Sequence, residues 1–124
     1  MIRYGMDKDF EKAKKIWQKC FLDSEDEVKF YFDNLYDRHK YLLLEENGEI
    51  KASLHENPYR LNFNGTVFES IYIVGVAVSP EYRGKGYMNE LIRESLIENR
   101  KREVPFVFLS PINPEIYRKY GFEY

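Results

Sequence analysis

The chain has 124 residues, of which 44% are hydrophobic, 17% aromatic and 32% charged. This length and apolar content suffice for one globular domain with its own core, which excludes a disordered or fibrous chain. Lys and Arg number 19 against 21 Asp and Glu, so the formal net charge is -2. Nucleic acids and anionic membranes require a concentrated basic face, so neither is expected as a partner.

The cysteine and histidine content also restricts the class of protein. Cys20 is the single cysteine, which rules out an internal disulfide. The longest apolar run, residues 71–78, is far shorter than the roughly 20 residues that span a bilayer, and residues 1–5 do not resemble a signal peptide. Two histidines and one cysteine, far apart, form no metal-ligand pattern. We therefore expect a cytoplasmic protein that holds no metal.

The first part of the chain predicts two helices. Apolar residues recur at helical spacing over residues 10–21, and Asp7 is placed to cap this segment. Ser24 followed by Glu27 has the form of a capping box, which predicts a second helix over about 24–36.

The junction of these helices carries an acidic cluster, formed by Asp23, Glu25, Asp26 and Glu27. Acidic residues in a first turn compensate the helix dipole, which is the favoured interpretation. The alternative is attraction of a cationic amine substrate.

The middle of the chain changes to the two-residue alternation of strands. Strand patterns flank the turn Asn47-Gly48, which predicts a hairpin. Pro58 is expected to interrupt the pairing. A second hairpin is predicted at Asn64-Gly65. Its second strand, about 66–78, is apolar on both faces in its second half, which is typical of a central strand.

A glycine-containing loop and a helix follow that strand. Ser79-Pro80 ends the strand, and from Gly84 a helical pattern runs to about Arg102. Residues 105–109 form another buried strand pattern, expected to run parallel to the earlier strand because a helix connects the two. A last helix is predicted to start at Asn113-Pro114 and to stop at Gly121.

The order of these elements indicates a mixed α/β sheet flanked by helices. We predict one domain over residues 1–124, with no internal repeat and no linker.

The loop before the long helix carries the chemistry. Gly84 and Gly86 have no side chains to block a ligand, and the first N–H groups of a helix have no partner within it. Those N–H groups and the positive helix end attract anions, and Arg83 and Lys85 add charge. The Walker and dinucleotide glycine patterns are absent. A phosphate or pyrophosphate is therefore expected here, and other phosphorylated ligands remain an alternative.

Two segments together resemble the GNAT superfamily of acetyl-CoA-dependent N-acetyltransferases. They are Val76-Ala77-Val78-Ser79-Pro80-Glu81-Tyr82-Arg83-Gly84-Lys85-Gly86-Tyr87-Met88 and Ile116-Tyr117-Arg118-Lys119-Tyr120-Gly121-Phe122. The family's phosphate loop reads Arg/Gln-x-x-Gly-x-Gly/Ala, and here Met88 takes its last, small position. This departure and the second segment are similar to the enhanced-intracellular-survival-type branch. The resemblance implies the acyl-CoA N-acyltransferase fold.

The resemblance implies an enzyme that moves an acetyl group from acetyl-CoA to a primary amine of a small molecule or peptide by direct attack. Main-chain groups of Val76, Ala77 and Val78 would bind the pantetheine arm, where this strand parts from residues 106–109. The pyrophosphate would lie on the main chain of Arg83, Gly84, Lys85, Gly86, Tyr87 and Met88.

Catalytic roles follow from the same resemblance. Tyr117 matches the tyrosine that protonates the departing sulfur, and a phenol with a pKa of about 10 carries that proton at neutral pH. A packing role is the alternative for Tyr117. Relatives often place a glutamate base on the central strand, but the matching stretch near Tyr72 has no carboxylate. Glu69 is the candidate base in its place, and Glu56 and His55 are further possibilities, although exposed strand positions are the default expectation for all three. His39 is expected to be exposed.

GNAT domains normally continue with two further strands, which this chain lacks after Tyr124. Three explanations remain open: a short sheet, a partner chain that completes it, or a longer protein of which this is the N-terminal part. An uncovered sheet edge favours self-association into a homo-oligomer. The alternative to an enzyme is a non-catalytic CoA-binding or protein-interaction module derived from a truncated acetyltransferase.

Overall fold

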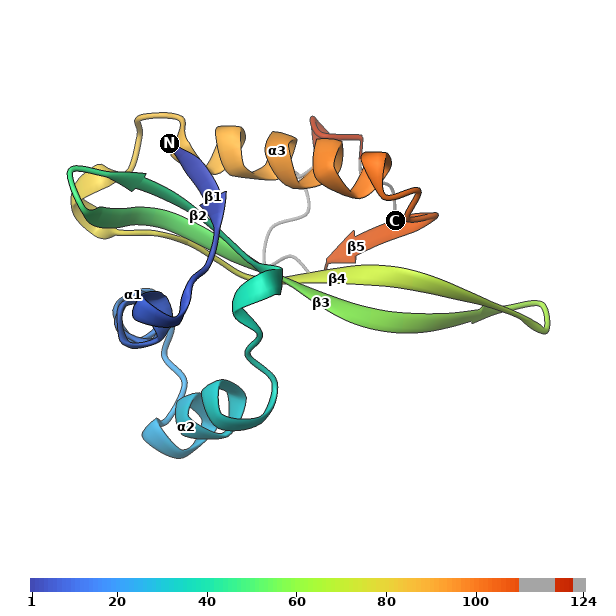
Figure 1. Cartoon of the computed structure of the whole chain (residues 1–124), viewed down its shortest axis with the longest axis horizontal. Helices are drawn as coiled ribbons and strands as arrows, with labels where there is room; N and C mark the ends of the chain where they lie inside the picture. The colour runs from blue at the N-terminus through green and yellow to red at the C-terminus, as the bar shows by residue number, and fades with distance from the viewer. Residues whose placement is uncertain (110–117, 122–124) are drawn as a thin grey trace.

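The computed structural model describes residues 1–109 and 118–121 (Figure 1). Its strands are β1 (Ile2–Tyr4), β2 (Tyr41–Glu46), β3 (Glu49–Phe63), β4 (Thr66–Val78) and β5 (Phe106–Leu109). Its α-helices are α1 (Phe10–Cys20), α2 (Glu25–Asn34) and α3 (Tyr87–Lys101). Short 3-10 turns occupy Asp7–Asp9, Arg38–Lys40 and Pro80–Tyr82.

The strands form one mixed sheet in the order β1-β2-β3-β4-β5. The pairs β1–β2, β2–β3 and β3–β4 are antiparallel, whereas β4 pairs in parallel with β5 from Ser70 opposite Phe106 to Ile73 opposite Leu109. Helix α3 covers one face of the sheet, while α1 and α2 lie on the other (Figure 1). The mixed α/β fold and the parallel strand after α3 are thus confirmed.

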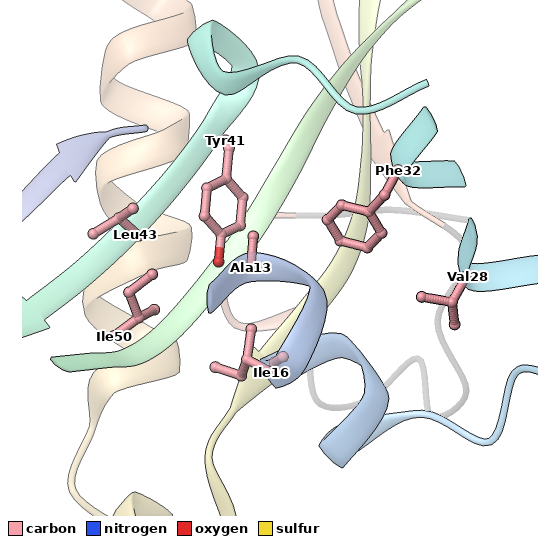
Figure 2. Packing of buried hydrophobic residues seen from close by; sticks show 8 residues of the cluster. Ala13, Ile16, Val28, Phe32, Tyr41, Leu43 and Ile50 are labelled. Carbon is pink, nitrogen blue, oxygen red and sulfur yellow. The ribbon is translucent and has the colours of Figure 1, made fainter. Parts of the chain in front are cut away.

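Side chains of the sheet alternate between two hydrophobic cores, one on each face. On the α1 and α2 side, Tyr41 of β2 points toward Ala13 of α1 (Figure 2), and Leu43 of β2 and Phe32 of α2 belong to the same core. The core on the α3 side consists of Leu42, Leu44, Ala52, Leu54, Ile71, Ile73, Leu91 and Ile92.

Helix α1 begins without the predicted cap at Asp7. The Asp7 carboxylate is exposed and pairs with Arg38 at 2.9 Å. The buried Asp9 instead accepts the Met6 N–H at 2.7 Å, and Arg3 donates to both of its oxygens at 2.8 and 3.1 Å. This charged hydrogen-bond pair lowers the pKa of Asp9 and ties the start of α1 to β1.

The local signals at α2 and at both hairpins are confirmed. The Ser24 hydroxyl accepts the Glu27 N–H at 3.2 Å, and the Glu27 carboxylate accepts the Ser24 N–H at 3.4 Å. Both residues of the Asn47-Gly48 and Asn64-Gly65 turns have positive φ, the backbone geometry of a two-residue hairpin loop.

Strand β3 runs without interruption through Pro58, so the predicted break there is wrong. Pro58 lies opposite Ile71 of β4, beyond the last residue pair with β2, which joins His55 to Tyr41. In the described part of the chain this stretch of β3 pairs with β4 alone. A proline that cannot donate is tolerated at such an edge.

The expectation that Glu56 is exposed is also wrong, because its side chain is fully buried. Its carboxylate accepts from the Tyr4 hydroxyl at 2.7 Å, the Ser95 hydroxyl at 2.5 Å and the Asn99 amide at 2.9 Å. Arg102 lies 3.6 Å away. The carboxylate thus links β1, β3 and α3, which indicates a structural role.

His55, likewise expected to be exposed, is only 2% exposed and lies on the opposite face of β3. Aromatic rings surround it, namely Trp17, Tyr31, Phe32, Tyr36 and Tyr41. Burial lowers the pKa of His55 to about 3, so the ring is neutral at physiological pH. His39, by contrast, is exposed as predicted.

We expect Glu56→Leu to lower the free energy of unfolding by about 3 kcal/mol, because Tyr4, Ser95 and Asn99 lose a buried charged acceptor. Urea denaturation measures the change. Glu69→Leu is the matched control at a 72% exposed position and should shift stability by less than about 1 kcal/mol. Equal losses in the two variants would contradict the structural role of Glu56.

His55→Phe should remove a pH dependence of stability. The unfolded histidine binds a proton near pH 6.5, whereas the folded one does so only near pH 3. Its stabilisation is therefore complete above pH 6.5 and is lost as the pH falls, by about 1 kcal/mol between about pH 7 and pH 5.5. Urea unfolding at these two pH values should show a smaller decrease in the free energy of unfolding for the variant than for the wild type. Equal decreases would refute the lowered pKa of His55 as the cause.

Candidate functional site

A cavity of about 380 Å³ lies where α1 ends, β4 ends and α3 begins. Every residue predicted to bind the cofactor lines it except Lys85. The lining residues that the sequence did not predict are Cys20, Phe21, Tyr82, Asn89, Lys119 and Tyr120. Tertiary packing brings Cys20 and Phe21 to the cavity, and no local motif marks them.

The start of α3 offers unpartnered N–H groups to this cavity. In the described part of the chain, the N–H groups from Gly84 to Asn89 have no acceptor, whereas the Arg83 N–H donates to the Pro80 carbonyl at 3.4 Å. The helical hydrogen bonds of α3 begin with Glu90, whose N–H donates to the Gly86 carbonyl at 3.1 Å. Such a cluster of free donors at a helix N-terminus binds anions.

Two glycines make this loop conformation accessible. Gly84 has φ 81° and Gly86 has φ 83°, in the left-handed region that favours glycine. Gly86 is the N-cap of α3, so the helix begins at Tyr87, slightly later than the sequence pattern indicates.

The main chain of β4 presents alternate residues to the cavity. The Ser79 N–H donates to the Lys51 carbonyl at 2.9 Å, so Ser79 and Ala77 turn their main-chain groups to β3. Val78 turns its groups away, and its carbonyl accepts from the Cys20 thiol at 3.4 Å and from Arg83 Nε at 3.2 Å. Of the three predicted pantetheine-binding residues, Ala77 thus uses its main chain within the sheet.

Positive side chains predominate around the cavity. Arg83 and Lys119 line it directly. Lys85 lies over the Tyr82 ring, 5.6 Å from its centre. The Tyr82 hydroxyl donates to Glu49 at 2.7 Å, which raises the pKa of Tyr82. No carboxylate of the described residues lines the cavity, so its electrostatics favour an anion.

The structure does not bring the three candidate bases to this cavity. Glu69 lies seven residues before Val76 on β4, roughly 20 Å away along the strand, and pairs with Arg60 at 3.0 Å. Glu56 and His55 are buried in the two cores.

Tyr117 and the predicted helix start at Asn113-Pro114 lie outside the described residues. Gly121 is described and has φ 93°, and its N–H donates to the Arg118 carbonyl at 3.0 Å. This geometry agrees with the predicted helix stop.

The acidic cluster between α1 and α2 is exposed. Glu27 belongs to the capping box, and Asp23 accepts the Trp17 indole N–H at 2.8 Å. These contacts favour the interpretation that the cluster stabilises the helix junction.

No helix within residues 1–109 and 118–121 is long and apolar enough to cross a membrane. No group of three His, Cys, Asp or Glu side chains in those ranges is arranged to hold a metal ion.

The fold is similar to solved structures of low sequence identity. A GCN5-related N-acetyltransferase from Anabaena variabilis matches with a TM-score of 0.86 and 22% identity, over 96% of this chain and 30% of that one. Eis1 from Mycobacterium abscessus matches with a TM-score of 0.84 and 19% identity, over 98% and 31%. The chain thus spans about 30% of the length of these two proteins.

Two shorter structures are similar over most of their length. A GNAT family acetyltransferase from Brucella melitensis in complex with acetyl-CoA has a TM-score of 0.80 and 20% identity, over 100% of this chain and 82% of that one. A predicted acetyltransferase with acetyl-CoA from Clostridium acetobutylicum has a TM-score of 0.79 and 20% identity, over 99% and 89%. No curated protein sequence matches the chain.

The strongest comparison is with a family model. The model of the acetyltransferase (GNAT) domain matches residues 1–124. The cavity at the end of β4, with free N–H groups at the start of α3, lies where the sequence resemblance predicts the phosphate loop. The chain belongs to the GNAT acetyltransferase family.

Proposed function

We propose that this chain binds acetyl-CoA and transfers its acetyl group to a primary amine. The observation that carries the proposal is the row of unpartnered N–H groups from Gly84 to Asn89 beside a cavity lined by Arg83 and Lys119. A pyrophosphate satisfies several such donors at once and neutralises the nearby charge.

We propose that the pantetheine arm lies in the part of the cavity along β4. The cavity extends from this loop along Val76 and Val78, which follow Ile73, the last residue of β4 in the described pairing with β5. A pantetheine arm carries amide groups that pair with free main-chain groups at a strand edge, so this stretch suits it. The Val78 carbonyl is the exception, because Cys20 and Arg83 already donate to it. The structures from Brucella melitensis and Clostridium acetobutylicum, both described with acetyl-CoA, support the same assignment by analogy of fold.

Direct transfer requires a neutral amine nitrogen to attack the carbonyl carbon of the acetyl thioester. The carbon–sulfur bond breaks, the sulfur takes up a proton, and the nitrogen releases one. We propose Tyr117 as the donor of the first proton, since a phenol is protonated at neutral pH. No carboxylate or histidine of the described residues lines the cavity. The amine proton is therefore proposed to leave to solvent, which favours acceptors that enter in the neutral form.

We further propose that residues 1–124 act as one domain of the enhanced-intracellular-survival-type branch. The single sheet shared by both hydrophobic cores supports one domain. The branch rests on the sequence features at Met88 and residues 116–122, and Eis1, at 19% identity, shares the fold.

The second candidate function is a non-catalytic module that binds CoA. The observation that favours it is the lack of a base among the described cavity residues. Release of free thiol in the presence of acetyl-CoA and a panel of primary amines distinguishes the two, because a binding module gives no release above the uncatalysed rate.

We expect isothermal titration calorimetry to detect CoA binding, and Gly86→Glu to abolish it. The new carboxylate repels the pyrophosphate, and a side chain at φ 83° strains the loop. Gly65→Glu is the matched control, since Gly65 also has φ 83° but lies in the turn between β3 and β4. Retained affinity in Gly86→Glu, or equal loss in the control, would count against the site.

Tyr117→Phe should lower turnover of any accepted amine by about 100-fold, because the departing thiolate loses its proton donor. Its affinity for CoA should stay within about twofold of wild type, since the exchange removes only the hydroxyl. Steady-state thiol release and calorimetry measure the two quantities. Wild-type turnover in the variant would remove Tyr117 from the mechanism.

A further inference from the structure

Strand β4 contains a bulge directly before the residues that line the cavity. Ser53 of β3 lies opposite Ala77, whereas His55 lies opposite Val74, so β4 has one residue more than β3 in this interval. Gly75 lies in the interval with φ 61°, the left-handed geometry found in glycine bulges. The bulge therefore depends on glycine at this position.

The bulge shifts the alternation of the β4 main chain by one residue. Without the extra residue, the main-chain groups that turn away from β3 would alternate in the opposite phase. Because of the shift, Val78 turns its carbonyl away from β3, where Cys20 and Arg83 donate to it. The bulge thus determines which main-chain groups of β4 reach the cavity.

Two rings pack against the face of Gly75 that a side chain would occupy. A Cβ atom built there would overlap Trp17 Cζ3 and lie 2.9 Å from His55 Cδ2. Both rings are held by further contacts. Trp17 stacks on Tyr31 at 4.6 Å, its indole N–H donates to Asp23 at 2.8 Å, and His55 is 2% exposed.

We infer that Trp17 and His55 are positioning residues that hold the Gly75 bulge, and through it the main chain that lines the cofactor cavity. The inference rests on the proposed function in one respect, since it concerns the cavity proposed to hold CoA. Trp17 comes from α1 and contacts Tyr31 and Phe32 of α2. The packing of both helices therefore contributes to the shape of the cofactor cavity.

The test is a substitution that opposes the packing, followed by one that relieves it. Gly75→Ala should weaken CoA binding at least about tenfold, because a displaced bulge moves the β4 main chain. Adding Trp17→Phe removes the ring atoms that the new methyl group overlaps and should recover most of the lost affinity. Calorimetry with CoA measures each variant at a temperature at which circular dichroism shows it folded.

The control isolates backbone strain from packing. Gly65→Ala introduces a side chain at φ 83°, where no atom lies within 4 Å of the new Cβ. This variant should be less stable than the wild type, as expected when a glycine with positive φ is replaced, and its CoA affinity should stay within about twofold of wild type. A loss of affinity in Gly65→Ala equal to that in Gly75→Ala would overturn the inference, as would wild-type affinity in Gly75→Ala or no recovery with Trp17→Phe.

A second readout does not depend on CoA. Amide chemical shifts of Val76 and Val78 should change in Gly75→Ala and return toward their wild-type values in the double variant. Unchanged shifts would refute the positioning role, whereas a wild-type protein that fails to bind CoA would refute the proposed function alone. If Gly75→Ala does not fold, Trp17→Phe is tested by itself. It should change these chemical shifts and weaken CoA binding at least about threefold. Wild-type chemical shifts together with wild-type affinity would overturn the inference.

Discussion

The site depends on one consequence of helix geometry, which is that the first turn of an α-helix leaves its N–H groups without acceptors. Helix α3 begins directly after β4, and the groups from Gly84 to Asn89 remain unpartnered within the described chain. Among residues 1–109 and 118–121 no side chain caps them, and Gly86 stands at the N-cap position. Free donors of this kind at a helix N-terminus form a site that favours an anion.

The rest of the fold holds that helix end beside the last residues of β4. Glu56 accepts hydrogen bonds from Ser95 and Asn99, so β3 is tied to the far half of α3. On the other face, His55 and Trp17 press on Gly75 and maintain the bulge. The two neighbouring residues of β3 thus support the cavity from opposite sides, although neither lines it.

This arrangement explains why none of the three predicted general bases reaches the cavity. Charged and polar residues in a strand are usually exposed, which makes them attractive candidates for catalysis. Here residues 52–56 of β3 are covered on both faces, so Glu56 and His55 are buried in separate cores and serve the structure. Glu69 is accessible, yet it lies on the part of β4 that is remote from the cavity and pairs with Arg60.

Predictions based on contacts between near neighbours in sequence agreed best with the structure. The capping box of Ser24 and Glu27 and the turn Asn64-Gly65 are examples, because their hydrogen bonds and dihedral angles join residues at most three positions apart. The prediction that Pro58 interrupts the strand was wrong, because whether a proline disrupts a strand depends on the neighbours of that strand.

The amino-acid sequence by itself determined the glycine loop, the helix that follows it and the two hairpins before it. These features arise from local backbone preferences and from the period of the apolar residues. Tertiary structure alone decided that Cys20 and Phe21 reach the cavity, that Glu56 and His55 are buried, and that Ala77 turns its main chain into the sheet. Burial and strand phase depend on residues distant in the chain, and a one-residue shift such as the bulge at Gly75 reverses the phase.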